Sequence, residues 1–204
     1  MDFTVASYAV WRADETSAKP DVSFIPPLER RRLTGVERAA LSVAWQVRPE
    51  GEVPVVFASR WGEIGVTVKL MTQFHADREM SPAGFSASVH NAAPGAFSLL
   101  TKSHAPYTAI AARERSLEAG LLEALTQGAG VFVCAEEATP AFYAPAFGPL
   151  QPACALAVRL EPGGTCRAEF HSTECGPVSF DAADAFFSGR ADALEAASFT
   201  LTRA

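Results

Sequence analysis

The sequence predicts an α/β protein in which a mostly parallel sheet is packed between helices. Three short apolar segments have the length and composition of strands that are buried on both faces: residues 53–58, 107–111 and 131–135. Helix-forming segments precede and separate these strands: residues 34–47, 63–75 and 116–127. Strands that alternate with helices in this way are typical of βαβ units, which build parallel sheets.

The first elements have clear local signals. Residues 3–11 combine Val, Tyr, Phe and Trp and predict the first strand. Residues 13–28 contain three prolines and are expected to form a loop. Thr34 and Glu37 form a capping box, in which the Thr34 side chain can accept from the Glu37 amide while Glu37 reaches back. The helix that they begin is expected to end before Pro49.

The remaining elements follow from periodicity and from helix-stop residues. Leu117, Leu121 and Leu125 lie on one face of the helix at 116–127, and Gly128 can end it. Weaker patterns predict the rest of the fold: a loop at 80–91, a short helix around 96–100, strands at 154–160 and 166–171, and a helix at 182–197. The chain of 204 residues is expected to form one domain over residues 1–204.

Composition excludes several classes of function. The net charge of −6 disfavours a nucleic-acid-binding surface. The N-terminus has no signal-peptide pattern and no run of apolar residues is long enough for a membrane span, so we expect a cytoplasmic protein. The four cysteines show no C-x-x-C spacing and are expected to be free thiols. The sequence therefore predicts neither a metal site nor a cofactor.

One stretch of the chain carries the most specific information. Residues 81–91 begin with Ser-Pro and end with Asn91, and Gly95, Pro106 and the helix at 116–127 follow. In this order and spacing they resemble the middle of a β-ketoacyl synthase N-terminal domain, from the thiolase-like superfamily. Ala105 replaces the glycine of the family's Gly-Pro. The resemblance covers residues 3–160 and implies a thiolase-like fold that corresponds to the N-terminal half of a ketoacyl synthase.

The resemblance also shows what the chain lacks. The position of the family's nucleophilic cysteine falls within Ala111, Ala112, Arg113 and Glu114, and none of these carries a thiol. Counting forward from Asn91 reaches Glu114. The family's catalytic histidines lie in a second half, whereas this sequence has about half the length of such an enzyme. We therefore expect no catalytic residue, and no condensing activity of the chain alone.

Residues 85–93 and 108–124 are similar to chain-length-factor-like subunits of aryl polyene and type II polyketide systems. This resemblance implies a heterodimer with a full-length β-ketoacyl synthase that acts with an acyl carrier protein in polyketide or fatty-acid-type biosynthesis. The isolated chain could instead pair with itself. The implied interface and acyl-tunnel residues are Ala83, Gly84, Phe85, Ser88, His90, Asn91, Tyr107 and Ile110. The apolar helix at 116–127 is expected to be left partly bare for a partner.

A basic cluster is a second candidate surface. It consists of Arg30, Arg31, Arg32 and Arg38, and acyl carrier proteins are acidic, so charge favours docking there. A solvated charge run is the competing interpretation.

His90, Asn91 and Glu114 each allow more than one interpretation. His90 and Asn91 could form a catalytic pair, but Asn91 is expected to cap the following helix while His90 packs in a loop. Glu114 could be a residual general base, or a solvated carboxylate that pairs with Arg113 or Arg115. Two competing functions follow: an acyl-thioester-processing enzyme that uses Cys175 or Glu114, and an acyl- or carrier-protein-binding module.

Overall fold

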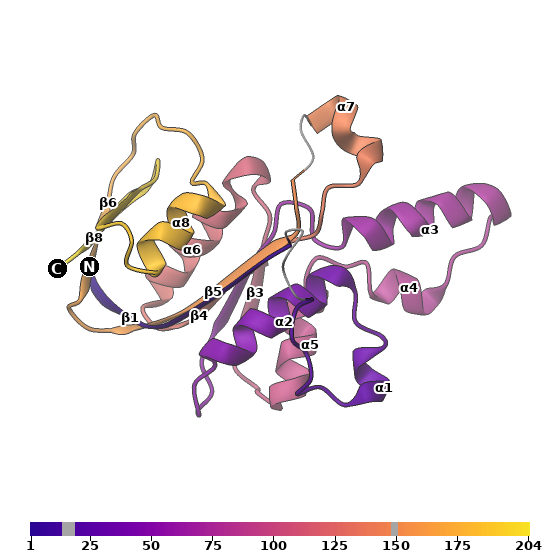
Figure 1. The fold of residues 1–204 in the computed structure, drawn as a ribbon, viewed down its shortest axis with the longest axis horizontal. Coiled ribbons are helices and arrows are strands. Elements are labelled where there is room, and N and C mark those ends of the chain that lie inside the picture. The colour runs from indigo at the N-terminus through magenta and orange to yellow at the C-terminus, as the bar shows by residue number, and fades with distance from the viewer. Residues whose placement is uncertain (14–18, 148–150) are drawn as a thin grey trace.

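The computed structural model describes residues 1–13, 19–147 and 151–204, and a single sheet runs through these ranges (Figure 1). Its strands stand in the order β3-β2-β4-β5-β1-β6-β8-β7. Their bounds are β1 Asp2–Arg12, β2 Val55–Ala58, β3 Tyr107–Ile110, β4 Gly130–Glu136, β5 Cys154–Pro162, β6 Cys166–Phe170, β7 Ala193–Glu195 and β8 Phe199–Arg203. The strands expected from the apolar segments are therefore confirmed.

Strand direction divides the sheet into two parts. β2 pairs in parallel with β3 and β4, while β5 pairs antiparallel with both β4 and β1. The strands β1 to β4 thus all run in one direction, with β5 reversed among them. Beyond β1, the strands β6, β8 and β7 pair antiparallel. The expected mostly parallel sheet is confirmed for the part from β3 to β1, and the antiparallel extension is an addition.

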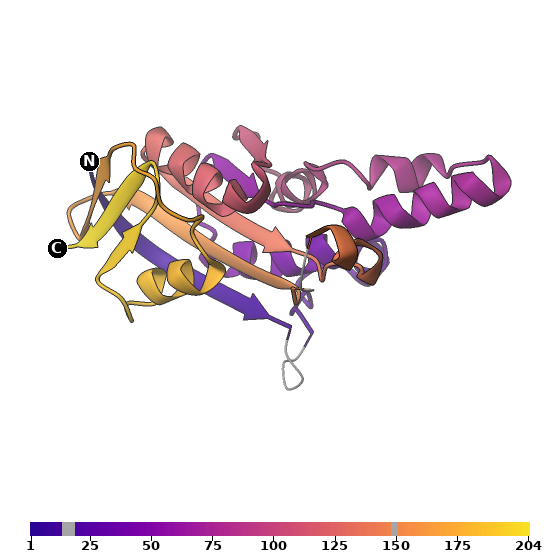
Figure 2. The same ribbon diagram turned by 90° about the horizontal axis from the view of Figure 1, so that it is seen from above.

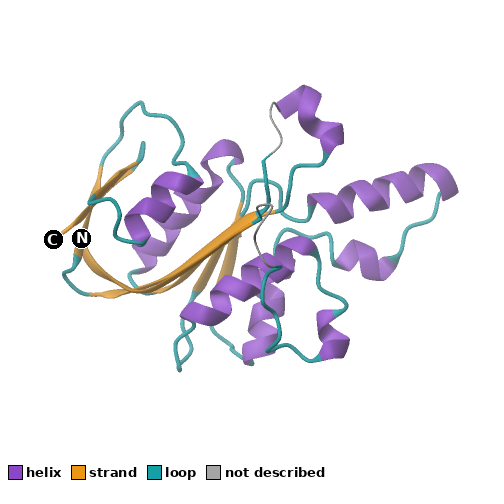
Figure 3. Ribbon diagram, viewed as in Figure 1, coloured by secondary structure: helices purple, strands orange, loops and turns teal. Residues whose placement is uncertain are grey.

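Helices cover both faces of the sheet (Figures 2 and 3). Phe132 and Cys134 of β4 pack in a core with α6 (Ser116–Gln127) and α8 (Phe180–Phe187). Val131, Val133 and Ala135 of the same strand pack in a second core with α2 (Gly35–Val47) and α5 (Ala92–Thr101). This alternation follows from the period of two along a strand. It makes a three-layer α/β/α arrangement.

Two further helices form an arm that projects away from the sheet (Figures 1 and 2). These are α3 (Ile64–Asp77) and α4 (Pro82–Ser86), which we call the α3–α4 arm, residues 64–86. In α3 only Ile64 and Leu70 are buried. Met71 is 62% exposed and Phe85 is 59% exposed. The arm therefore presents apolar side chains to solvent, and α4 lies where a loop was expected.

Four short elements lie in connections. They are α1 (Pro27–Arg30), η1 (Arg113–Arg115), η2 (Ala141–Tyr143) and α7 (Ala144–Phe147). The helix α1 starts at the end of the expected loop at 13–28, of which residues 14–18 lie outside the described ranges. The capping box of α2 is confirmed, since the Glu37 amide donates to Thr34 Oγ1 at 3.1 Å and the Thr34 amide donates to Glu37 Oε2 at 2.7 Å.

Two expectations for the C-terminal region are wrong. The helix expected at 182–197 ends at Phe187, because Ser188 caps it and Gly189 adopts a left-handed φ of 80°; β7 follows instead. The helix α6 is also not left bare. Val178 and the aromatic residues Phe186 and Phe199 join its apolar face in one core, so the C-terminal elements cover it.

Candidate functional site at the turn into helix α6

The turn between β3 and α6 brings together the four residues at which the family's nucleophile was expected. Arg113 has a φ of 53°, in the left-handed region that non-glycine residues rarely occupy. The Ser116 hydroxyl accepts from the Ala112 amide at 2.9 Å and donates to the Arg113 carbonyl at 2.7 Å. These bonds hold a sharp strand-to-helix turn, in which Arg113 and Glu114 lie at the surface.

Glu114 is a paired carboxylate. Its Oε1 accepts from Arg60 Nη2 at 2.7 Å, and its side chain is 54% exposed. A hydrogen bond from its own amide and the charge of Arg60 lower the pKa of Glu114, so it stays ionised. Arg115 is not its partner, because Arg115 pairs with Glu118 at 2.8 Å and donates to the Cys175 carbonyl, whereas the charge of Arg113 also lowers the pKa of Glu114. This environment favours a salt-bridged surface group over a general base near neutral pH.

A cavity of about 670 Å³ lies beside this turn, at the carboxyl ends of the parallel strands. Arg60 and Trp61 follow β2, Glu136 and Glu137 lie at the end of β4, and Arg12 ends β1. Sequence reasoning missed these residues. Their signal was their position directly after apolar strands, because the carboxyl ends of parallel strands converge on one crevice.

Glu136 organises one wall of the cavity. It accepts from Ser59 Oγ at 3.0 Å and from the Arg60 amide, and so holds the segment that follows β2. Burial raises the pKa of Glu136 to about 7 against the opposing effect of these bonds. The two thiols that line the cavity are poor nucleophiles. Burial raises the pKa of Cys154 to about 12 and that of Cys134 well above its usual value.

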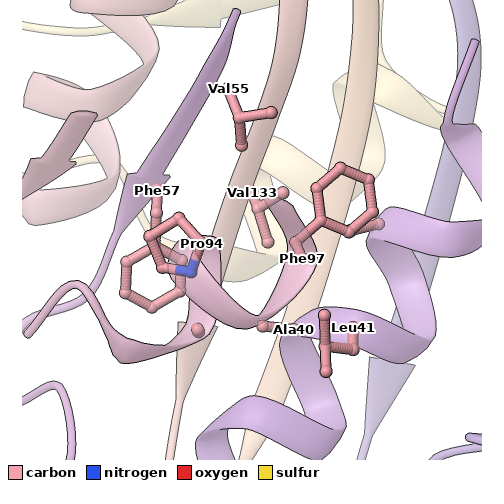
Figure 4. Close-up of a pocket in the computed structure, with 9 residues that line it drawn as sticks. Ala40, Leu41, Val55, Phe57, Pro94, Phe97 and Val133 are labelled. Carbon is pink, nitrogen blue, oxygen red and sulfur yellow. The ribbon is translucent and has the colours of Figure 1, made fainter. Parts of the chain in front are cut away.

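A second space is a packing gap. It lies between α2, α5 and the sheet, and its volume is about 10 Å³, too small for a ligand (Figure 4). In Figure 4, Phe57, Pro94 and Phe97 surround it together with aliphatic side chains. In the described ranges, no group of His, Cys, Asp and Glu side chains is arranged to hold a metal ion.

The expected interface residues lie on the α3–α4 arm, on the segment after it and on β3. Ala83, Gly84 and Phe85 belong to α4, and Ser88 follows it. Tyr107 and Ile110 are the ends of β3, which lies at the edge of the sheet and pairs with β2 alone among the described strands.

Two members of this set have structural contacts. His90 Nε2 lies 2.9 Å from the Ser59 carbonyl, and its ring meets Phe57 edge-on, so His90 packs in a loop as expected. Asn91 occupies the N-cap position of α5, but its side chain makes no capping hydrogen bond, which corrects the expected role. Asn91 is exposed, whereas His90 is held by Ser59 and Phe57, an arrangement that favours a structural role of His90 over a catalytic pair.

Gly84 is a contact between the two helices of the arm. A Cβ atom on Gly84 would lie 2.9 Å from Leu70 Cδ2 on α3. Enlarging Gly84 would therefore displace the Leu70 side chain between the two helices, besides filling any neighbouring tunnel. The exposed Phe85 is a cleaner position at which to change the surface.

The basic cluster lies at the end of α1, on the residues that follow it and in the first turns of α2, away from the turn into α6 (Figure 1). Arg30, Arg31 and Arg38 line a shallow cleft of about 240 Å³, whereas Arg32 does not line it. Arg31 and Arg32 are exposed.

None of the helices in the described ranges combines the length and hydropathy needed to cross a membrane. A comparison with curated protein sequences finds no match.

Solved structures similar to this chain share its thiolase-like fold. One is a chain of the ketosynthase ApeO in complex with its chain length factor ApeC from Xenorhabdus doucetiae, with a TM-score of 0.80, 22% identity and 100% of both chains covered. A chain of the ishigamide ketosynthase/chain length factor follows, with a TM-score of 0.54, 18% identity, and 78% of this chain and 54% of that chain covered.

A third similar structure is AntDE:AntF, a type II polyketide acyl-carrier protein in complex with its ketosynthase bound to the hexaketide. It has a TM-score of 0.51 and 16% identity, with 74% of this chain and 57% of that chain covered. This chain thus spans just over half of the matched chains in the second and third structures. The family model "Beta-ketoacyl synthase, N-terminal domain" matches residues 6–193. The chain belongs to the β-ketoacyl synthase N-terminal domain family.

Proposed function

We propose that this chain is a non-catalytic, chain-length-factor-like partner of a full-length β-ketoacyl-[acyl carrier protein] synthase in polyketide or aryl polyene biosynthesis. The turn into α6 is the observation that carries the proposal. A member of a synthase family has Arg113 and an ion-paired Glu114 at this turn, where the synthases need a thiolate. The similar structures in which a ketosynthase is bound to a chain length factor support the same role.

The partner would bind along β3 and the α3–α4 arm. One edge of β3 has no strand partner among the described residues, and unpaired strand edges readily accept another chain. The α3–α4 arm exposes Met71, Phe74 and Phe85. Large apolar side chains that are exposed together on one projecting element favour a protein interface. In the absence of the synthase, the same edge could join two copies of this chain.

Within this interface, residues of α4 and the segment after it would border the partner's acyl tunnel. The proposed set is Ala83, Gly84, Phe85, Ser88, His90, Asn91, Tyr107 and Ile110. Bulk at these positions would shorten the product and small side chains would lengthen it. Phe85 is the member that we expect to act most directly, because it is 59% exposed in the isolated chain.

We further propose that an acidic acyl carrier protein docks on Arg30, Arg31, Arg32 and Arg38. Opposite charges would steer the encounter, so the association rate should fall as salt increases.

The residues 1–204 would act as one domain in the cytoplasm, where carrier-protein-dependent biosynthesis takes place.

A matched pair of phenylalanine variants tests the interface. Phe85→Glu places a charge on the α3–α4 arm, whereas Phe170→Glu places the same charge at a 48% exposed position on β6, far from β3 in the strand order. After co-expression with the synthase, native mass spectrometry should show loss of the complex with Phe85→Glu and retention with Phe170→Glu. Retention of the complex in both variants would rule out the arm as the interface.

A further inference from the structure

The arginine cleft on α1 and α2 has the features of an anion-binding site. Arg30 Nε donates to the Ile25 carbonyl at 3.2 Å, and Arg38 donates to the Arg30 carbonyl. These bonds fix two of the guanidinium groups beside the cleft that Arg31 also lines. Because a guanidinium carries several N–H donors, Arg30 and Arg38 each keep donors that the protein backbone does not use.

Among the described residues, no carboxylate lies within ion-pair distance of the arginines of this cleft. Within the described ranges, none of its three arginines forms an ion pair, although the chain as a whole has a net charge of −6. Asp21 interacts with Arg30 only at longer range, since its carboxylate accepts from the Ser23 amide at 2.9 Å. Three positive charges are therefore gathered around a hollow that has room for a small anion.

We propose that this cleft binds the phosphate group of a phosphate ester. The planar fork of a guanidinium matches the oxygens of a phosphate, and charge-assisted hydrogen bonds of this kind are among the strongest in proteins. Pro27 also lines the cleft but has no backbone N–H, so the hydrogen bonds to the phosphate would come from the arginine side chains. The biological source of the phosphate rests on the proposed function: it would be the phosphodiester through which a carrier protein holds its acyl arm.

The test uses pantetheine 4′-phosphate and pantetheine, which differ only in the phosphate, titrated into the purified chain at low salt in a calorimeter. We expect binding of the phosphate ester and at least tenfold weaker binding of pantetheine. Arg31→Gln should weaken binding of the ester about tenfold, since one charge-assisted contact is lost. Arg167→Gln is the matched control, because it removes the same charge from a 60% exposed residue of β6 that does not line the cleft, and it should change binding less than threefold.

Equal binding of the two probes, or equal weakening by both substitutions, would overturn the phosphate site in favour of diffuse charge attraction. The source is tested separately with carrier protein that has or lacks the phosphopantetheine arm. Tighter binding of the armed carrier, lost in Arg31→Gln, supports the carrier as the source. Equal binding of both carriers, with the small ester still bound, overturns that source alone. None of these measurements needs the synthase, so they are independent of heterodimer formation.

Discussion

Substitution of Glu63 by Gln should make the protein less sensitive to alkaline pH. Glu63 is the N-cap of α3, at the base of the α3–α4 arm, and is only 2% exposed. Its Oε1 accepts from Thr34 Oγ1 at 2.9 Å, whereas its Oε2 has no hydrogen-bond partner among the described residues. Burial, and then the charges of Glu37 and Glu137, raise the pKa of Glu63 from 4.5 to about 8, against the lowering effect of Thr34.

The sign of the effect follows from proton binding. Between pH 4.5 and about 8 the folded protein holds a proton on Glu63 that the unfolded chain has lost. Stability contributed by this group therefore decreases as pH rises through that window and levels off above it. One pKa unit corresponds to about 1.4 kcal/mol, so the whole shift has an upper bound of roughly 5 kcal/mol. Relaxation around the ionised carboxylate reduces this bound, and we expect roughly 2 kcal/mol.

The assay is urea unfolding at several pH values from 5 to 9 for the unmodified protein and the Glu63→Gln variant. Gln resembles the protonated carboxyl, so the variant should gain roughly 2 kcal/mol relative to the unmodified protein between pH 5 and pH 9. Glu174→Gln, at an exposed position, controls for removal of one negative charge. If the difference between Glu63→Gln and the unmodified protein is independent of pH, the carboxyl is not protonated in the folded state.

Two further substitutions test the packing. Asp184→Asn weakens the hydrogen bonds that this buried carboxylate accepts from a tyrosine and two arginines, so it should lower the free energy of unfolding by about 3 kcal/mol. Asp192→Asn, at an exposed position, should change the free energy of unfolding little. Gly120→Ala should lower the free energy of unfolding by about 2 kcal/mol, because the new Cβ would lie 2.5 Å from a side chain of β2. A Cβ at Gly51 would meet no atom within 4 Å, so Gly51→Ala should leave the free energy of unfolding unchanged. Equal effects within either pair in urea unfolding would refute the packing described.

Local patterns predicted the elements that depend on neighbouring residues. The capping box at Thr34 and the helix α6 were correct, because a cap or a 3.6-residue period is written into adjacent positions. The helix α4 was missed although its signal was present: Ser81 is its N-cap and Pro82 its first residue, a frequent helix start.

Long-range contacts account for what the sequence could not show. The Ala-rich segment after Phe187 has helical composition, but its pairing as β7 depends on β8, which comes later in the chain. The partner of Glu114 could not be found locally either, since Arg60 lies on the segment after a different strand. Likewise, Met71 and Phe74 have core-type side chains, and only the fold places them on an arm outside the core.

The most direct test of the proposed role is co-expression of this chain with a full-length β-ketoacyl synthase from the same biosynthetic cluster. Native mass determination and a malonyl-condensation assay would be carried out on the complex and on each chain alone. A stable 1:1 complex with condensing activity that neither chain shows alone is the expected result. A synthase that is fully active without this chain, and a chain that stays separate from it, would contradict the proposal.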